Sequence, residues 1–183
     1  ICAVRTGSGK SPASRRVCEI LKGMVKKVVV VPHPMPYGDL SRQRLQRFAS
    51  YEDCQKHDCT IEEIEEYEPH LEQHTVVYAG VDYAAILAEA EKEADIIVWD
   101  GGNNDTPFYV PDIHITLVDP HRPGHELTYY PGETNLLMAD IVVINKEDTA
   151  KPENIALLKE HIQQANPEAA VIDAALPVTV ENA

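Results

Sequence analysis

The sequence predicts an α/β protein with a three-layer arrangement, in which a mostly parallel sheet is covered by helices and carries a small helical insertion. Three observations support this class. Short β-branched strands alternate with amphipathic helices along most of the chain. An apolar strand end leads into a glycine-rich loop and then a helix near the first residue. The 183 residues suit one compact domain, which we take as residues 1–183.

The first elements follow from local patterns. Residues 1–4 ("ICAV") read as the end of a buried strand. Residues 10–24 predict a helix, because Pro12 falls in the first turn, where its missing N–H costs nothing, and Gly23 lies near the end. Residues 26–40 begin with a β-branched run suited to a strand covered on both faces and continue as a proline-rich loop.

Residues 41–73 differ in composition from the alternating strands and helices around them and predict a helical insertion. The segment is basic and expected to be helical over 41–50, and it is strongly acidic over 60–74. The alternation then resumes. The remaining expected elements are a strand, helix and strand over 76–102, strands within 111–120 and 139–148 separated by a polar loop at 121–133, a helix over 152–167 and a strand over 169–175.

The loop "VRTGSGKS" predicts a phosphate-binding site. Backbone N–H groups of a glycine-rich turn and the positive end of the next helix attract phosphate, and strand, loop and helix occur here in the required order. Val4 departs from the G-x-x-x-x-G-K-S pattern, and the alternative is a glycine turn that only connects strand to helix. The predicted nucleotide-binding residues are Gly7, Ser8, Gly9, Lys10 and Ser11, with Lys10 also catalytic and Ser11 also a magnesium ligand.

A carboxylate follows the strand "IIVW". Asp100, with Gly101 and Gly102 after it, is predicted to hold Mg²⁺ directly or through water and to act in catalysis. The alternative is a turn or cap aspartate. The polar edge continues through Asn103, Asn104 and Asp105, which are candidates for substrate contact.

The segment "VVINKED" also ends a strand. Asn145, Lys146 and Asp148 match the N-K-x-D pattern in which the aspartate accepts hydrogen bonds from guanine, and Ala174 and Ala175 fall where a base-packing loop would follow. The alternative is that Asp148 caps the helix beginning near residue 152.

Arginines cluster in two segments of an otherwise acidic chain. Guanidinium groups bind phosphate and carboxylate bidentately, which predicts an anion cradle. The alternative is a solvated helix face paired with acidic neighbours. The predicted residues are Arg15 and Arg16, with catalytic roles, and Arg42, Arg44 and Arg47, with substrate-binding roles. The loop residues His121, Arg122 and His125 complete the predicted substrate site.

Composition limits the partners. The formal charge is -14, with 30 acidic against 16 basic residues, which disfavours nucleic acid and anionic lipid. No apolar run approaches the ~20 residues of a membrane span, no secretory signal is visible, and four sparse cysteines indicate reduced thiols, so we expect a cytoplasmic protein. The group Cys54, His57 and Cys59 lacks the fourth ligand that structural zinc needs.

Long motifs together resemble the cyclic 2,3-diphosphoglycerate synthetase family and its GTPase-like relatives. They are "CAVRTGSGKSPASRR", "HPMPYGDLSRQRLQRF", "VDPHRPGHELTYYPGETN" and "VVINKEDT". The chain begins with the strand end "ICAV" and no initiator methionine, so we expect a fragment truncated at the N-terminus and short of a natural C-terminus. Members of the family that it resembles are longer at both ends.

The resemblance implies ATP-dependent closure of 2,3-diphosphoglycerate into a cyclic pyrophosphate, with ATP as co-substrate, Mg²⁺ as cofactor and a small anionic phosphorylated substrate. N-K-x-D favours GTP instead, so GTP stays open, and a regulatory or metal-delivery GTPase is the alternative function. A homo-oligomer is left open.

Overall fold

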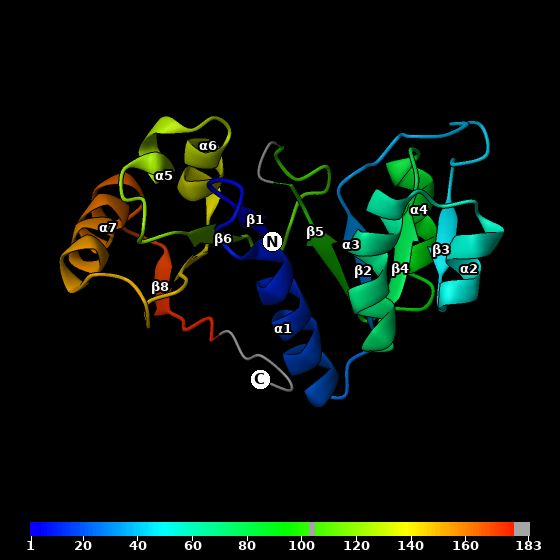
Figure 1. Cartoon of the computed structure of the whole chain (residues 1–183), viewed down its shortest axis with the longest axis horizontal. Coiled ribbons are helices and arrows are strands. Elements are labelled where there is room, and N and C mark those ends of the chain that lie inside the picture. Colours follow the sequence, from blue (N-terminus) through cyan, green and yellow to red (C-terminus); the bar gives the residue numbers. More distant parts are fainter. Residues whose placement is uncertain (103–104, 178–183) are drawn as a thin grey trace. The chain divides into compact units, whose positions relative to one another are not determined.

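The computed structural model describes residues 1–102 and 105–177, so Asn103 and Asn104 lie outside the described residues. Figure 1 labels the helices and strands in chain order. The chain divides into two compact units, which we describe separately. The first comprises Ile1–Lys10 and the chain from Gly102 onward, and the second comprises Ser11–Gly101.

The first unit contains a parallel sheet with strand order β1-β6-β7-β8. Its core is built from β-branched and leucine side chains, including Val118, Val142 and Leu158, all fully buried. The elements are β1 (Cys2–Ala3), β6 (Ile115–Val118), β7 (Ile141–Ile144), β8 (Ala170–Asp173), α5 (His125–Thr128), α6 (Gly132–Met138) and α7 (Pro152–Ala165).

The second unit contains a sheet with order β3-β4-β2-β5, in which only β3 runs antiparallel to its neighbour. Its central strand β2 is buried at every position, as expected of a strand covered on both faces. The elements are α1 (Lys10–Gly23), β2 (Val28–Pro32), β3 (Gln46–Phe48), α2 (Tyr51–Lys56), α3 (Ile61–Glu72), β4 (Val76–Ala79), α4 (Tyr83–Ala90) and β5 (Ile96–Asp100).

The predicted α/β class with mostly parallel pairing is confirmed, and α2 and α3 supply the helical insertion. The expectation of a helix over 41–50 was wrong. This segment forms a turn followed by β3, because Gln46 and Phe48 are buried while Arg47 between them is exposed, which is the period of a strand.

The expectation of a plain loop over 121–133 was also wrong, since α5 lies inside it and α6 begins in it. Both helices are short, with four and seven residues, so their hydrophobic periodicity is too brief to read in the sequence. Gly124, before α5, has a left-handed φ of 97°, which suits glycine.

The start of α3 shows why this acidic segment folds as a helix. Thr60 accepts a hydrogen bond from the backbone N–H of Glu63, and the Glu63 carboxylate accepts one from the backbone N–H of Thr60 at 2.7 Å. This reciprocal capping satisfies two N–H groups that the helix itself leaves without partners. One face of α3 is then buried through Tyr67, His70 and Leu71.

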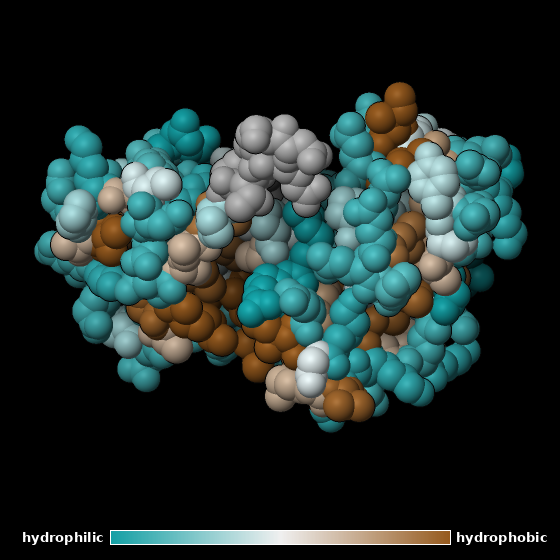
Figure 2. All heavy atoms as spheres, turned by 60° about the horizontal axis from the view of Figure 1, so that its bottom comes forward, coloured by the Kyte–Doolittle hydropathy of each residue, from teal (hydrophilic) through white to brown (hydrophobic). Residues whose placement is uncertain are grey.

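Hydrophilic residues cover most of the face shown in Figure 2, with apolar residues gathered in places. None of the helices in the described parts of the chain is long and apolar enough to cross a membrane.

Candidate functional site

The glycine-rich loop of the first unit has the backbone that its sequence predicts. Gly7 and Gly9 have left-handed φ angles of 82° and 92°, which cost side-chain-bearing residues about 1–2 kcal/mol each. A Cβ at Gly9 would lie 2.1 Å from Nδ2 of Asn145, so a side chain here would displace that amide as well as strain the backbone. The hydroxyl of Ser8 donates to the carbonyl of Arg5 at 3.1 Å, and α1 begins directly after the loop, at Lys10.

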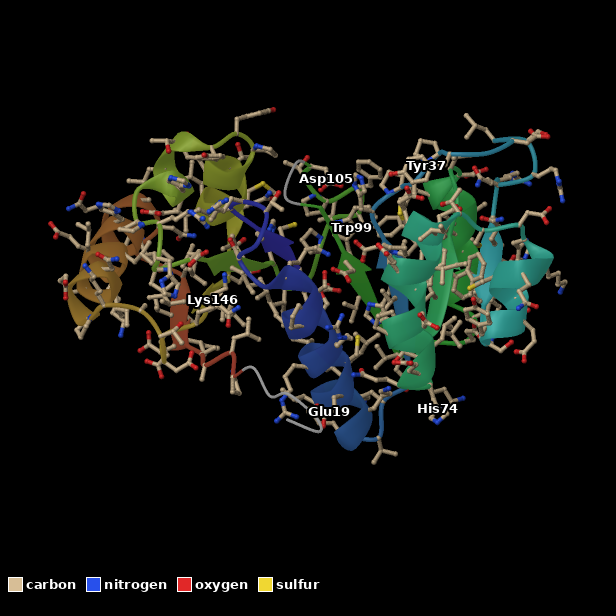
Figure 3. All side chains as sticks on the ribbon, viewed as in Figure 1. Glu19, Tyr37, His74, Trp99, Asp105 and Lys146 are labelled. Atoms are coloured by element: carbon tan, nitrogen blue, oxygen red, sulfur yellow. The ribbon has the colours of Figure 1, made fainter. Side chains whose placement is uncertain are left out.

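The N-K pair after β7 holds this loop. Nδ2 of Asn145 donates to the carbonyl of Ser8 at 2.8 Å, and Nζ of Lys146 donates to the carbonyl of Gly7. Figure 3 labels Lys146. Segments 137 and 139 residues apart in sequence therefore meet within the first unit, and the loop's carbonyls are satisfied from the N-K side.

Asp119 joins the same network and was not anticipated from the sequence. Its side chain is 1% exposed, and Oδ2 lies 3.2 Å from Nζ of Lys146 and 3.9 Å from Nη1 of Arg122. Its Oδ1 accepts from the backbone N–H of His121 at 3.0 Å. A signal was available: Asp119 directly follows β6, just as Asp100 ends β5, at the edge where parallel sheets gather functional groups.

Two predicted substrate residues, His121 and Arg122, thus lie beside Asp119, and His121 also meets the hydroxyl of Thr149 at 3.0 Å. The ring of His125 instead stacks on Tyr129 at 4.6 Å between centroids. Sequence reasoning also passed over Arg5, whose Nε and Nη1 are buried without a hydrogen-bond partner among the described residues.

Asp148 does not cap the following helix. The N-cap of α7 is Lys151, and it makes no side-chain capping bond. Oδ1 of Asp148 accepts instead from the backbone N–H of Leu176 at 3.2 Å, which ties it to the loop after β8 where Ala174 and Ala175 lie. The carboxylate remains exposed.

In the second unit, Asp100 at the end of β5 is 2% exposed and is held by two side chains. Ser14 donates to its Oδ1 at 2.8 Å, and Nε2 of His70 lies 3.3 Å from its Oδ2. Burial, and next the nearby Asp100 carboxylate, raise the pKa of the Cys18 thiol to about 11. Neither Ser14 nor His70 was predicted.

Ser11 and Arg15, also in the second unit, line a cavity of about 420 Å³. They are four residues apart on α1 and so share a face. The rest of the lining comes from the loop after β2 and from α3. It comprises His33, Met35, Tyr37, Glu62, Glu65 and Glu66.

The other predicted arginines of this unit are each ion-paired with a different carboxylate. Arg47 forms a bidentate pair with Glu93 at 2.8 and 2.9 Å, and this hydrogen bonding raises its pKa. The remaining pairs are exposed: Arg16 with Glu19 at 2.6 Å, Arg42 with Asp58 at 3.4 Å and Arg44 with Asp82 at 3.0 Å. A substrate anion would have to replace these carboxylates.

The oxygen donors of Ser11 and Asp100 suit Mg²⁺, which prefers one or two protein oxygens together with water and phosphate. Both oxygens of Asp100 are already engaged, which fits an aspartate that holds the ion through water. No group of three or more His, Cys, Asp or Glu side chains suited to a metal is found among residues 1–102 and 105–177.

Several known proteins are similar to this chain. Residues 73–175 match the family model described as the P-loop domain of cyclic 2,3-diphosphoglycerate synthetase. The chain is 61% identical over 181 residues to arginine synthetase ArcE of Thermococcus kodakarensis, covering 99% of this chain but 40% of that protein. It is 30% identical over 96 residues to cyclic 2,3-diphosphoglycerate synthetase of Pyrococcus furiosus, covering 50% of this chain and 22% of that protein.

Among solved structures, HypB from Helicobacter pylori in complex with nickel superposes with a TM-score of 0.56 at 15% identity, covering 95% of this chain and 76% of that one. The hydrogenase maturation factor HypB from Archaeoglobus fulgidus superposes with a TM-score of 0.53 at 16% identity, covering 94% of this chain and 80% of that one. At these identities the likeness shows the fold alone. The chain spans less than half the length of the curated relatives it matches.

Proposed function

Because this chain belongs to the family of the cyclic 2,3-diphosphoglycerate synthetase P-loop domain, we propose that it is the nucleotide-binding part of an ATP-dependent synthetase. The observation that carries the proposal is the attachment of Asn145 and Lys146 to the carbonyls of Ser8 and Gly7. With the carbonyls of Gly7 and Ser8 held in this way, the proposed loop turns its N–H groups toward phosphate.

The proposed roles follow the chemistry of phosphoryl transfer. Backbone N–H groups from Gly7 to Ser11 bind the phosphates, and Lys10 neutralises the β- and γ-phosphates. Ser11 and Asp100 hold Mg²⁺, with Ser14 and His70 fixing the Asp100 carboxylate. The ion supplies further charge neutralisation when bound.

The choice of base depends on Asp148 rather than on the whole N-K-x-D pattern. Asn145 and Lys146 hold the loop through contacts that require no guanine. Their presence in an N-K-x-D pattern is therefore compatible with ATP as the nucleotide. Asp148 already accepts a backbone N–H through one oxygen. We therefore propose ATP as the co-substrate.

In the proposed reaction, an acceptor oxygen attacks the γ-phosphate and ADP leaves. A second nucleophile then expels the transferred phosphate and completes the new bond. The relative with 61% identity is named for arginine, so we propose a reaction that forms arginine. Cyclisation of 2,3-diphosphoglycerate is the second candidate, and the exposed arginines Arg42, Arg44 and Arg47 remain its predicted anion cradle.

A GTP-binding regulatory or metal-delivery GTPase is the candidate from another class. The specific observation in its favour is Asp148, whose exposed carboxylate lies beside the loop carrying Ala174 and Ala175. A client metal would need ligands beyond those found in the described residues.

Calorimetry on the intact protein tests the proposal with ATP and GTP side by side in the presence of Mg²⁺. We expect tighter ATP binding and a loss of roughly a hundredfold or more in Lys10→Ala, since a buried charged contact to phosphate is removed. A matched control is Lys56→Ala, which removes a lysine at the exposed end of α2. Unchanged ATP affinity in Lys10→Ala would refute the proposed site, and strong GTP preference would favour the GTPase.

A further inference from the structure

The cavity of the second unit has two walls of opposite charge. Ser11 and Arg15 face it from α1, next to the positive end of that helix. Glu62, Glu65 and Glu66 face it from α3, where the spacing of three and four residues places them on one face. Tyr37, labelled in Figure 3, stands on the loop after β2.

The charged side chains of this cavity do not take part in intramolecular ion pairs among the described residues. Among the described residues, the side chains of Arg15 and the three glutamates form no hydrogen bond or ion pair with one another or with any other group. By contrast, every other arginine except Arg5 is ion-paired. Like charges three and four residues apart on a helix repel one another, and the single guanidinium of Arg15 does not balance three carboxylates.

The volume and lining suit a small molecule of amino-acid size. About 420 Å³ falls within the range of ligand pockets. Met35, also in the lining, contributes half-buried apolar surface for a methylene chain. A polyanion would meet the glutamates at close range, which makes this cavity a poor site for 2,3-diphosphoglycerate.

We infer that this cavity binds the acceptor or product as a zwitterion, with its carboxylate on Arg15 and its guanidinium or ammonium group on Glu62, Glu65 and Glu66. This inference rests on the proposed synthetase function and assigns the substrate class of that site. It places the reacting molecule on the helix face that carries Ser11, the proposed magnesium ligand.

The test is calorimetry on the intact protein with three probes: arginine, agmatine (which lacks the carboxylate) and 2,3-diphosphoglycerate. We expect the double variant Glu65→Gln, Glu66→Gln to bind arginine roughly tenfold or more weakly, because charge-assisted hydrogen bonds are lost. Arg15→Gln should weaken the binding of arginine but leave the affinity for agmatine unchanged, because agmatine has no carboxylate for Arg15 to bind. The control is Glu68→Gln, Glu72→Gln, which removes the same charge from α3 outside this cavity and should leave arginine binding within twofold of wild type.

Equal arginine affinity in the two double variants would overturn the inference. So would tight binding of 2,3-diphosphoglycerate that is lost in Arg15→Gln. Mg-ATP affinity is measured on the same proteins, so a failure of the proposed nucleotide site appears as lost ATP binding, whereas a failure of this inference leaves ATP binding intact.

Discussion

Replacing Gly9 by alanine tests the contact between the glycine-rich loop and the segment after β7. Two costs add at this position. The left-handed φ of 92° costs about 1–2 kcal/mol for a residue with a Cβ. The new methyl also meets Nδ2 of Asn145 at 2.1 Å, so that side chain must leave the carbonyl of Ser8, at a further cost of about 1–3 kcal/mol for the lost buried hydrogen bond.

Gly7→Ala and Gly23→Ala are the matched controls. Gly7 has a similar φ of 82°, but nothing lies within 4 Å of its would-be Cβ, so only the strain of about 1–2 kcal/mol is expected. Gly23 ends α1 without positive φ and without a close neighbour, so alanine there should be neutral or stabilising by up to about 1 kcal/mol. Urea unfolding with linear extrapolation measures all three.

A double-mutant cycle isolates the clash. In an Asn145→Ala background the obstructing amide is gone, so Gly9→Ala should cost no more than Gly7→Ala. The expected coupling between the two changes is therefore about 1–3 kcal/mol. A coupling below about 0.5 kcal/mol would refute the close packing of Asn145 on the loop, and Mg-ATP affinity measured on the same variants should fall in the same order.

Three further changes follow from the structure. Ser14→Ala removes the hydroxyl that donates to buried Asp100 and should lower the free energy of unfolding by about 1–3 kcal/mol. It should also raise the Mg²⁺ concentration needed for nucleotide binding. An unchanged Mg²⁺ titration would contradict this. Arg47→Ala breaks an exposed bidentate pair and should cost about 1 kcal/mol or less in urea unfolding, while an acceptor Michaelis constant raised tenfold would instead place Arg47 in the substrate site. Burial lowers the pKa of His114 below its usual 6.5, so its contribution to stability is present above pH 6.5 and is lost as the pH falls through the lowered value. The melting temperature of His114→Phe should therefore fall by less than that of the wild type when the pH is lowered from 7.5 to 5.

The sequence predicted what depends on local pattern. The loop glycines, the N-K pair and Asp100 each follow a strand in a recognisable order, and the alternation of strands and helices predicted the class of fold. Asp119 carried the same signal as Asp100 and lies in the family motif "VDPHRPGHELTYYPGETN", but its own role was not predicted.

The rest depends on contacts between distant segments. Ser14 and His70 reach Asp100 from positions 86 and 30 residues away, and no spacing rule links them. The prediction of a helix over 41–50 was wrong for a related reason. Its arginines suit a helix, but burial of Phe48 beside β4 imposes an extended backbone, since tertiary packing overrides weak local propensity.

The grip of Asn145 and Lys146 on the loop has an electronic consequence. The carbonyl of Gly7 shares its peptide unit with the N–H of Ser8, and the carbonyl of Ser8 shares one with the N–H of Gly9. A donor on the oxygen side polarises the whole peptide unit and makes its N–H a stronger donor. In the proposed site, the two side chains therefore strengthen the N–H donors of Ser8 and Gly9 that would meet phosphate, whichever base the nucleotide carries.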